Sequence, residues 1–294
     1  MSLFSLLGAV EIGLIFAPVA LGVYISFRLL RFPDLTVDGS FPLGGAVCAV
    51  LISTGTNPWI ATLAATAAGA LAGMVTGWLN VKLKIMDLLA SILMMIALYS
   101  INLRVMGGPN IPLINDPTIF NLLQPESMDD YVFRPLLLLV IVIAAKLLLD
   151  WFFATERGLA IRATGSNARM ARAQGVNTGG MILLGMAVSN GLVGLAGAMF
   201  VQTQGGSDIS MGIGTIVIGL AAVIVGESIL PSRRIVYATL AVVIGAIVYR
   251  FFIAAALNSD FIGLKAQDLN LVTAVLVTIA LVIPQLKRKF SRKP

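Results

Sequence analysis

Few residues of this 294-residue chain have side chains that could do covalent or acid–base chemistry. The sequence has no histidine and a single cysteine, Cys48, which lies in an apolar stretch. It therefore lacks the commonest general base and cannot form a disulfide framework or a thiolate metal site. No nucleophile–base pair stands out either, which disfavours a membrane-embedded enzyme. We predict no catalytic residue, no metal site and no cofactor in this chain.

Two carboxylates and a lysine stand out within the long apolar stretches, and the carboxylates are functional candidates by default. They are Glu11, Glu227 and Lys146. Glu227 is also close in sequence to Arg233 and Arg234, so an ion pair with these arginines is the alternative to a functional role. Lys146 is expected to extend its ammonium group toward the end of its apolar stretch that is predicted below to be cytoplasmic.

A long polar segment, residues 154–180, separates two apolar runs and has the sequence ATERGLAIRATGSNARMARAQGVNTGG. Thr155 is predicted to cap a short helix that ends near Gly165, and Ser166 or Asn167 a second helix that ends at Gly175. We expect a bend at Gly165 between the two helices. The segment carries four arginines, Arg157, Arg162, Arg169 and Arg172. It is interpreted either as a docking surface for another protein or as an anchor for anionic lipid headgroups.

The composition shows which elements must position these residues. Hydrophobic residues make up 58% of the chain and charged residues 12%, with a mean hydropathy of +0.96. A soluble domain has about 25% charged residues, so this chain is expected to have lipid as its solvent. The net charge of +6 does not indicate nucleic-acid binding, because the basic residues lie between the hydrophobic runs.

The apolar runs predict an all-α fold, a polytopic bundle of about nine transmembrane spans (eight to ten being possible) in a single domain of residues 1–294. The predicted spans are Leu3–Phe27, Gly39–Thr54, Pro58–Leu79, Leu83–Leu103, Pro135–Phe153, Met181–Thr203, Ile213–Leu230, Ile235–Ala255 and Leu269–Leu286. No basic residue precedes Arg28, so the first run is expected to remain as a span rather than to be a cleaved signal peptide.

The distribution of basic residues predicts the orientation. With nine spans, fifteen of the twenty lysines and arginines fall on one side and four on the other. The positive-inside rule makes the richer side cytoplasmic, with the N-terminus outside and the C-terminus inside. Residues 154–180 are then a cytoplasmic loop and residues 104–134 an extracytoplasmic loop. Arg250 is among the four basic residues predicted at the outer side.

Two similar segments enter short spans from opposite sides. They are DLTVDGSFPLGGAV, from Asp34, and DISMGIGTIVIGLAA, from Asp208. Similar segments of opposite orientation indicate an inverted repeat, whose glycine-interrupted helices would border a transport path. The alternative is that these glycines only allow close helix packing. The polar residues predicted along the path are Asp34, Thr36, Asp38, Ser40, Asn102, Arg104, Asp208 and Ser210.

Some of these polar residues have simpler explanations. Asn102 and Arg104 end the fourth predicted span and could instead anchor it at the interface. Ser189 and Asn190, in the sixth predicted span, are expected to form hydrogen bonds between helices, which is the commoner role of such residues.

The loop of residues 154–180 resembles the coupling loop of permeases in the branched-chain amino acid and ribose ABC importer family. The matching residues are Thr155, Gly158, Arg162, Ala163, Gly165, Asn167, Ala171, Gly175 and Val176. The run GLAAVIVGES at Gly219–Ser228 also fits this family. The run ALYSINLRVMGGPNIPL at Ala97–Leu113 is similar to the subgroup that is paired with tryptophan/tyrosine-type binding proteins.

This resemblance implies a permease homodimer in a bacterial inner membrane, a pair of cytoplasmic ATP-binding subunits and an extracytoplasmic substrate-binding protein. ATP and Mg²⁺ would bind to the ATPase subunits, since this chain has no G-x-x-x-x-G-K-[ST] phosphate loop. The residues expected to contact the ATPase are Thr155, Arg157, Gly158, Arg162, Gly165, Asn167, Arg169, Arg172 and Gly175. An ion-coupled secondary transporter is the alternative, because inverted repeats and buried carboxylates also serve ion coupling.

Overall fold

The structure, a computed structural model, describes residues 3–114, 116–125, 129–232 and 234–257, together with residues 275 and 278. Most of these residues are helical. The α-helices are α1 (Leu3–Val23), α2 (Val37–Ser53), α3 (Pro58–Leu83), α4 (Asp87–Met106), α5 (Ile119–Leu123), α6 (Asp130–Ala154), α7 (Glu156–Ser166), α8 (Ala168–Ala173), α9 (Thr178–Gln204), α10 (Thr215–Ile229) and α11 (Ile235–Leu257). A π-helix, η1 (Tyr24–Leu30), continues α1, and a 3₁₀-helix, η2 (Ile209–Gly212), precedes α10.

The predicted helical membrane bundle is confirmed. Within the described residues, seven helical segments are long and apolar enough to cross a membrane, and α2 is a shorter apolar helix. These eight segments correspond to the first eight predicted spans. The ninth, Leu269–Leu286, lies outside the described residues except for residues 275 and 278, so the count of nine stays a prediction.

The largest differences from the predicted spans are at α6, which begins at Asp130 rather than Pro135, and at the turn between the third and fourth spans. The prediction ended the third span at Leu79 and began the fourth at Leu83, but α3 continues to Leu83. Lys84 then ends α3 with a left-handed backbone (φ 55°), and α4 begins at Asp87. The hydropathy of this short turn does not reveal the reversal, because the turn itself contains apolar residues.

Helix α9 lies at the centre of the bundle, with α2 and α3 packed closely against it. Small residues allow this packing. A Cβ atom added at Gly44 of α2 would lie 2.2 Å from the carbonyl oxygen of Gly194 on α9. The two backbones therefore touch, as small residues allow in membrane helices. Close packing is thus at least one reason for the glycines of the second span.

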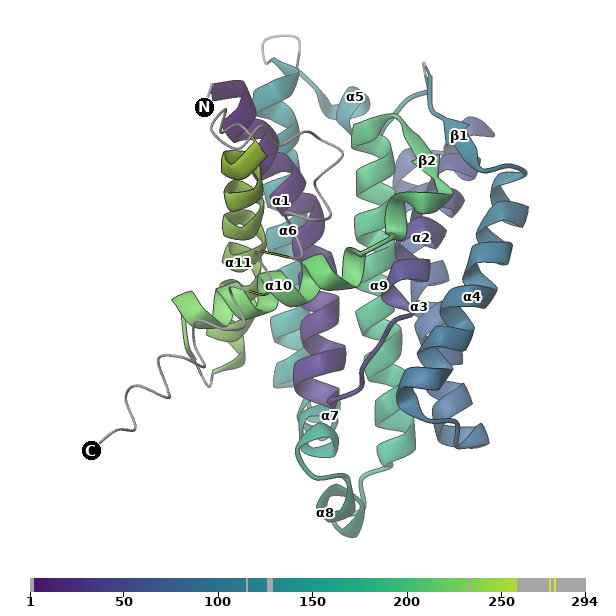
Figure 1. Ribbon diagram of the computed structural model, residues 1–294, viewed down its shortest axis with the longest axis vertical. Helices are drawn as coiled ribbons and strands as arrows, with labels where there is room; N and C mark the ends of the chain where they lie inside the picture. Colours follow the sequence, from purple (N-terminus) through teal and green to yellow (C-terminus); the bar gives the residue numbers. More distant parts are fainter. Residues whose placement is uncertain are drawn as a thin grey trace.

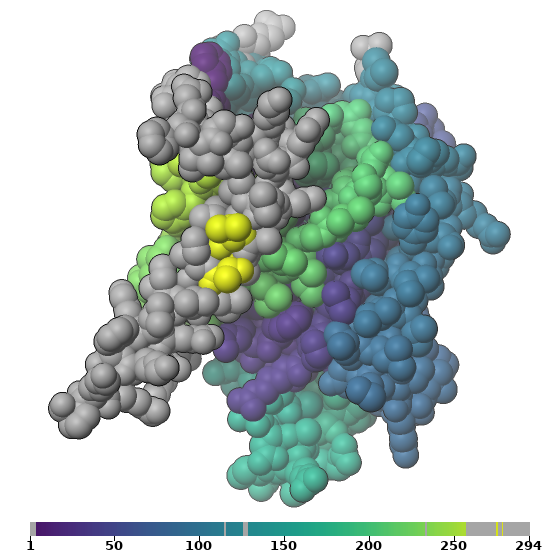
Figure 2. All heavy atoms as spheres, in the orientation of Figure 1, coloured from purple at the N-terminus to yellow at the C-terminus, as the bar shows by residue number. Residues whose placement is uncertain are grey.

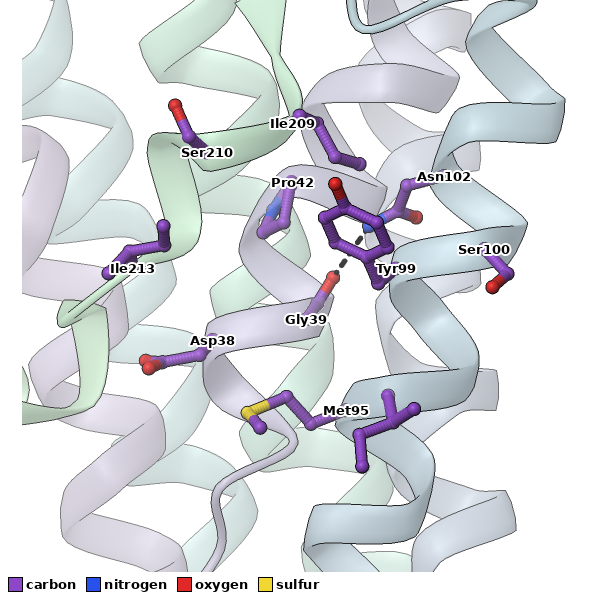
Figure 3. A pocket seen from close by; sticks show the side chains of 11 residues that line it. Asp38, Gly39, Pro42, Met95, Tyr99, Ser100, Asn102, Ile209, Ser210 and Ile213 are labelled. Atoms are coloured by element: carbon purple, nitrogen blue, oxygen red, sulfur yellow. Dashed lines mark hydrogen bonds between the residues drawn. The ribbon is translucent and has the colours of Figure 1, made fainter.

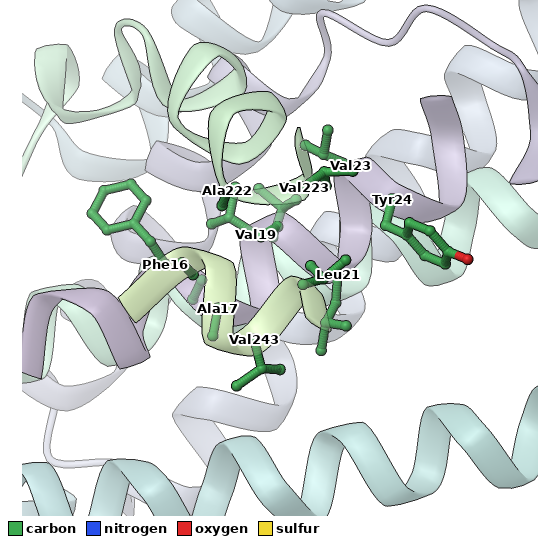
Figure 4. Close-up of a cluster of buried hydrophobic side chains, with 14 of the residues drawn as sticks. Phe16, Ala17, Val19, Leu21, Val23, Tyr24, Ala222, Val223 and Val243 are labelled. Atoms are coloured by element: carbon green, nitrogen blue, oxygen red, sulfur yellow. The ribbon is translucent and has the colours of Figure 1, made fainter. Parts of the chain in front are cut away.

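Helix α1 is apolar on all faces, and most of its middle and C-terminal part is buried. A helix that is hydrophobic all round is expected to be enclosed by others. Figure 4 shows Phe16 and Val19 of α1 near Val223 of α10 and Val243 of α11. This cluster fixes α10 and α11 against the first span.

Figure 1 shows α10 inclined steeply to α1, α6 and α9, which run along the long axis of the molecule. Helices α7 and α8 lie at one end of the bundle, and the N-terminus lies at the other. The N-terminal end also carries a small two-stranded antiparallel sheet, in which β1 (Asn110–Pro112) pairs with β2 (Gly206–Asp208). This sheet joins the segment after α4 to the segment after α9.

Candidate functional site

A pocket of about 550 Å³ lies between the first turns of α2, the middle of α4 and η2. Its polar lining residues include Asp38, Tyr99, Asn102 and Ser210, and most of its wall is apolar (Figure 3). In Figure 2, α2 is visible at the bottom of the hollow between the blue α4 and the green segment that contains η2. Both similar segments of the sequence, from Asp34 and from Asp208, thus contribute residues to the pocket.

Asp38 joins these two segments directly. Its carboxylate accepts hydrogen bonds from the backbone N–H groups of Gly214, at 3.3 Å, and Ile216, at 2.8 Å. These N–H groups belong to the N-cap and first turn of α10, where they have no partner within the helix and the helix dipole favours a negative charge. Gly214 precedes the helix with φ +81°, a conformation that favours glycine. A residue of the first segment therefore caps the helix that begins within the second segment.

Asp34, Thr36 and Ser40 lie behind the pocket, in a buried polar network. Asp34 is fully buried and accepts from the Thr36 backbone N–H, at 2.9 Å, and from Nδ2 of Asn190, at 2.8 Å. The Ser40 hydroxyl donates to Oδ1 of Asn190, at 2.8 Å. Thr36 also shares a hydrogen bond of 2.9 Å with the hydroxyl of Thr76. None of the three path candidates is among the described residues that line the pocket.

The network also affects the ionisation of Asp34. Burial raises the pKa of this carboxyl, and the hydrogen bonds from Thr36 and Asn190 act in the opposite direction. The prediction that Asn190 and Ser189 bond between helices is confirmed, since Ser189 donates to the Gly22 carbonyl at 2.7 Å.

The remaining path candidates divide between the pocket and its surroundings. Asn102 lines the pocket, is fully buried and donates to the Gly39 carbonyl at 3.2 Å. Ser210 also lines the pocket, and its backbone N–H donates to Asp208 at 2.7 Å. Asp208 thereby caps η2 rather than lining the pocket. Arg104 is exposed near the end of α4, outside the set of described lining residues.

The loop of residues 154–180 forms the two predicted helices, α7 and α8. Thr155 caps α7 by accepting from the Gly158 N–H at 3.4 Å, and Asn167 caps α8 by accepting from the Met170 N–H at 3.0 Å. Gly175, with φ +83°, follows α8 as predicted. These caps depend on contacts within three residues, which is why the sequence reveals them.

The predicted bend at Gly165 is wrong. Gly165 lies inside α7, and the chain turns at Asn167, which has an extended backbone (φ −155°, ψ 95°). A Cβ atom at Gly165 would lie 1.7 Å from the carbonyl oxygen of Leu29 in η1. The glycine is required because two backbones meet there, not because the chain bends.

The outer face of α7 and α8 combines positive charge with apolar surface. Arg157, Arg169 and Arg172 are exposed, while Arg162 is half-buried. Arg172 also donates to the hydroxyl of Thr178 at 3.1 Å. A groove of about 260 Å³ runs along the two helices, bordered by Asn167 and by Met170, which is 63% exposed. This mixed surface suits contact with a protein better than contact with headgroups alone.

Two ion pairs involve charged residues whose partners the sequence analysis did not identify. Glu227, near the end of α10, pairs with Arg28 of η1, and Nε of Arg28 lies 2.7 Å from Oε1; Arg233 lies outside the described residues. Lys146 reaches along α6 as predicted but ends in a mostly buried pair with Asp150, at 2.5 Å, instead of at the interface.

Two further charged residues lie within the helices of the bundle, on α1 and α11. Arg250, predicted at the outer side, is only 9% exposed within α11, and its guanidinium carbon lies 4.3 Å from the centre of the Phe16 ring. This cation–π contact is not visible in the sequence, because Phe16 lies on another helix. Glu11 is half-buried on α1, where the charge of Arg134 acts on it.

Comparisons with known proteins agree with this architecture. Residues 5–283 match the family described as "Branched-chain amino acid transport system / permease component". The chain is 40% identical over 264 residues to the "Tyrosine transport system permease protein" of Clostridioides difficile (strain R20291), covering 90% of this chain and 86% of the relative. No solved structure shows a significant match.

More distant relatives are sugar permeases. The chain is 27% identical over 261 residues to the "Galactofuranose transporter permease protein YtfT" of Escherichia coli (strain K12), covering 88% of this chain and 73% of the relative. It is 26% identical over 265 residues to the "Ribose import permease protein RbsC" of the same strain, covering 87% and 78%. The comparisons give no support to the ion-coupled alternative. The chain belongs to the branched-chain amino acid transport system/permease component family and is a membrane permease of an ABC importer.

Proposed function

We propose that this permease binds a separate ATPase subunit through α7 and α8 and passes a small amino acid or related compound along a path that includes the pocket. The observation that carries this proposal is the surface of α7 and α8, two capped helices at one end of the bundle with exposed arginines and Met170. The chain has no phosphate loop, so ATP and Mg²⁺ are assigned to the partner and no cofactor to this chain.

The position of α7 supports a role in force transmission rather than simple anchoring. Gly165 brings its backbone into direct contact with that of Leu29 in the first span. A lipid anchor would need only positive charge at the surface. A helix that transmits the movement of a partner needs a rigid contact with the membrane helices, and the close approach of Gly165 to Leu29 provides one.

The chemistry of the pocket favours an amine-bearing solute with an apolar side chain. Among the described lining residues, the one charged group is the carboxylate of Asp38, and none is basic. Met95, Ile96 and Ile213 supply apolar walls. A sugar would leave many hydroxyl groups facing these walls without partners, which is costly. The relative named for tyrosine transport points to the same class of solute.

The remaining assignments complete the proposed assembly. The permease is a homodimer in a bacterial inner membrane, and an extracytoplasmic binding protein delivers the solute at the end opposite α7 and α8. The N-terminus is outside and the C-terminus cytoplasmic. Lys82 and Lys84 lie at the C-terminal end of α3, and the turn from α3 to α4 is at the same end of the bundle as α7 and α8 (Figure 1), as the positive-inside rule requires of a cytoplasmic face.

Charge reversal at Arg169 and Arg172 tests the docking surface. The tagged permease is purified in mild detergent from the membranes of its own host, and co-purifying ATPase is identified by mass spectrometry and by ATP hydrolysis. We expect R169E/R172E to lose most of the ATPase, and raising the salt concentration to weaken the parent complex, because exposed ionic contacts are screened.

The matched control is K82E/K84E, which reverses two exposed charges at the same end of the bundle but outside α7 and α8. This control should keep the ATPase. Equal loss in both double variants would indicate a general effect of surface charge on lipid contact, and retention in both would remove α7 and α8 from the interface. Either result would overturn the proposal.

A further inference from the structure

The cytoplasmic end of the first span contacts both α7, one of the two proposed docking helices, and α10. It is the π-helix η1, which ends at Arg31 in a left-handed conformation (φ 57°). Single π-helical turns are rare, less regular than the α-helix, and often found at functional sites. Because η1 packs against both α7 and α10, a change in its position would reach both helices.

The contact between η1 and α7 is rigid. A Cβ atom at Gly165 would lie 1.7 Å from the Leu29 carbonyl oxygen and 2.8 Å from the Cα atom of Leu30. No flexible side chain separates the two backbones at this point. A displacement of α7 by a bound partner must therefore displace η1 as well.

The contact between η1 and α10 is ionic and bidentate. Nε of Arg28 lies 2.7 Å from Oε1 of Glu227, and the second guanidinium nitrogen contacts Oε2. Paired N–H···O bonds of this kind fix orientation as well as distance. The two side chains are 57% and 30% exposed, so the pair adds little to folding stability, and a purely structural role explains it poorly.

Helix α10 connects this ion pair to the pocket. It has 15 residues, so it is a rod of about 22 Å at 1.5 Å per residue. Glu227 lies near its C-terminal end, and the carboxylate of Asp38 holds its N-terminal end. Asp38 and Ile213, the residue just before Gly214, both line the pocket. One rigid helix thus reaches from the ion pair to the pocket.

From this chain of contacts we infer that the Arg28–Glu227 pair transmits movement of α7 to the pocket through η1 and α10. This inference rests on the proposed function, in which α7 and α8 bind the ATPase. Arg28 and Glu227 are positioning residues, since neither lines the pocket between α2, α4 and η2. If the pair is broken, the ATPase should remain bound, but its cycle of ATP binding and hydrolysis should no longer change the accessibility of the pocket.

The test follows the accessibility of the pocket and needs no transported solute. In a C48A background, a thiol is introduced by S210C at the exposed, pocket-lining Ser210. The purified permease–ATPase complex is labelled with a maleimide, with and without ATP, Mg²⁺ and vanadate. We expect nucleotide trapping to change the labelling rate by about fivefold, the lower end of typical couplings between sites.

Four variants test whether the Arg28–Glu227 ion pair is needed for the response of the pocket to nucleotide. R28E and E227R should each abolish the response to nucleotide while retaining the ATPase, and the exchange R28E/E227R should restore it. E227Q, which keeps the shape of the side chain, should weaken the response. The control is the exposed pair of Arg134 and Asp130 at the other end of the bundle, where R134E should change nothing.

The outcomes distinguish this inference from the proposal on which it rests. If the parent complex contains no ATPase, the proposed docking surface fails. If the ATPase is present but the single variants respond like the parent, or the parent does not respond, the link is refuted. It is also refuted if the single variants fail to assemble and the exchange variant assembles without regaining the response.

Discussion

Asn190 connects α9 to both the segment before α2 and α2 itself through one amide group. Its Nδ2 donates to Asp34 and its Oδ1 accepts from Ser40, both at 2.8 Å. Asp34 is fully buried, and a buried carboxylate is tolerated only where hydrogen bonds replace its hydration. The network therefore fixes the start of α2, the helix that presents Asp38 to α10.

Replacement of Asn190 by alanine should be strongly destabilising. N190A leaves the Asp34 carboxylate without one of its donors and Ser40 without its acceptor, at a cost of about 2–4 kcal/mol for an uncompensated buried charged group. The neighbouring control S189A removes one hydrogen bond, to the Gly22 carbonyl, and should cost about 1 kcal/mol. Thermal unfolding in detergent measures both. Equal losses would show that the network carries no charged group that depends on Asn190.

The same variant should show a pH dependence of definite sign. Burial raises the pKa of Asp34, so ionisation of this carboxyl costs folding stability, and the cost appears as the pH rises through the pKa of the folded state. Removing a donor raises that pKa further. The loss of stability in N190A, relative to the parent, should therefore be smaller at pH 5 than at pH 8. A loss that is independent of pH would contradict this assignment.

At the scale of elements, α7 and α8 show which features the sequence reveals and which it hides. Thr155 and Asn167 were identified as caps because their acceptors and donors lie within three residues of each other. Gly165 was assigned to the wrong role because the backbone it contacts, at Leu29, lies far away in the sequence. The pairing of Arg28 with Glu227, 199 residues apart, was not predicted for the same reason.

Replacement of Gly165 by valine tests the close backbone contact between α7 and η1. In G165V the new side chain would collide with the carbonyl group of Leu29, so α7 should be forced away from η1. We expect normal membrane insertion with weakened ATPase binding, or ATP hydrolysis that no longer drives uptake. Co-purification and transport are measured side by side.

Leu159, which is exposed on the same helix, supplies the control. L159V introduces the same β-branched residue on α7 but without the collision, and the loss of helix propensity on replacing leucine by valine is small. It should behave as the parent does. If G165V also assembles and transports normally, the contact between α7 and η1 has no role in coupling.

At the scale of the whole molecule, hydropathy and charge predicted the bundle well. Lipid permits only a few backbone arrangements, so eight of the predicted spans could be located from apolar length alone. The pocket could not be located in this way, because it depends on which faces of α2, α4 and η2 meet. The similarity of the segments at Asp34 and Asp208 was the one signal in the sequence that pointed to it.

The predicted orientation is tested by thiol accessibility in a C48A background. A thiol at position 169 should be labelled only from the cytoplasmic side, because Arg169 lies on α8 among the arginines of the inner loop. A thiol at position 116, in the segment between β1 and α5, should be labelled from outside. Reversal of either result in intact cells would overturn the orientation.

The energy source of transport tests the central claim most directly. The permease–ATPase complex is reconstituted in vesicles with its binding protein, and uptake of radiolabelled L-tyrosine, L-leucine and D-ribose is followed. The account predicts that transport of an amino acid requires ATP on the side of α7 and α8, and that it persists when ionophores remove proton and sodium gradients. Uptake that is driven by an ion gradient without ATP, or that is abolished by the ionophores while ATP remains, would contradict it.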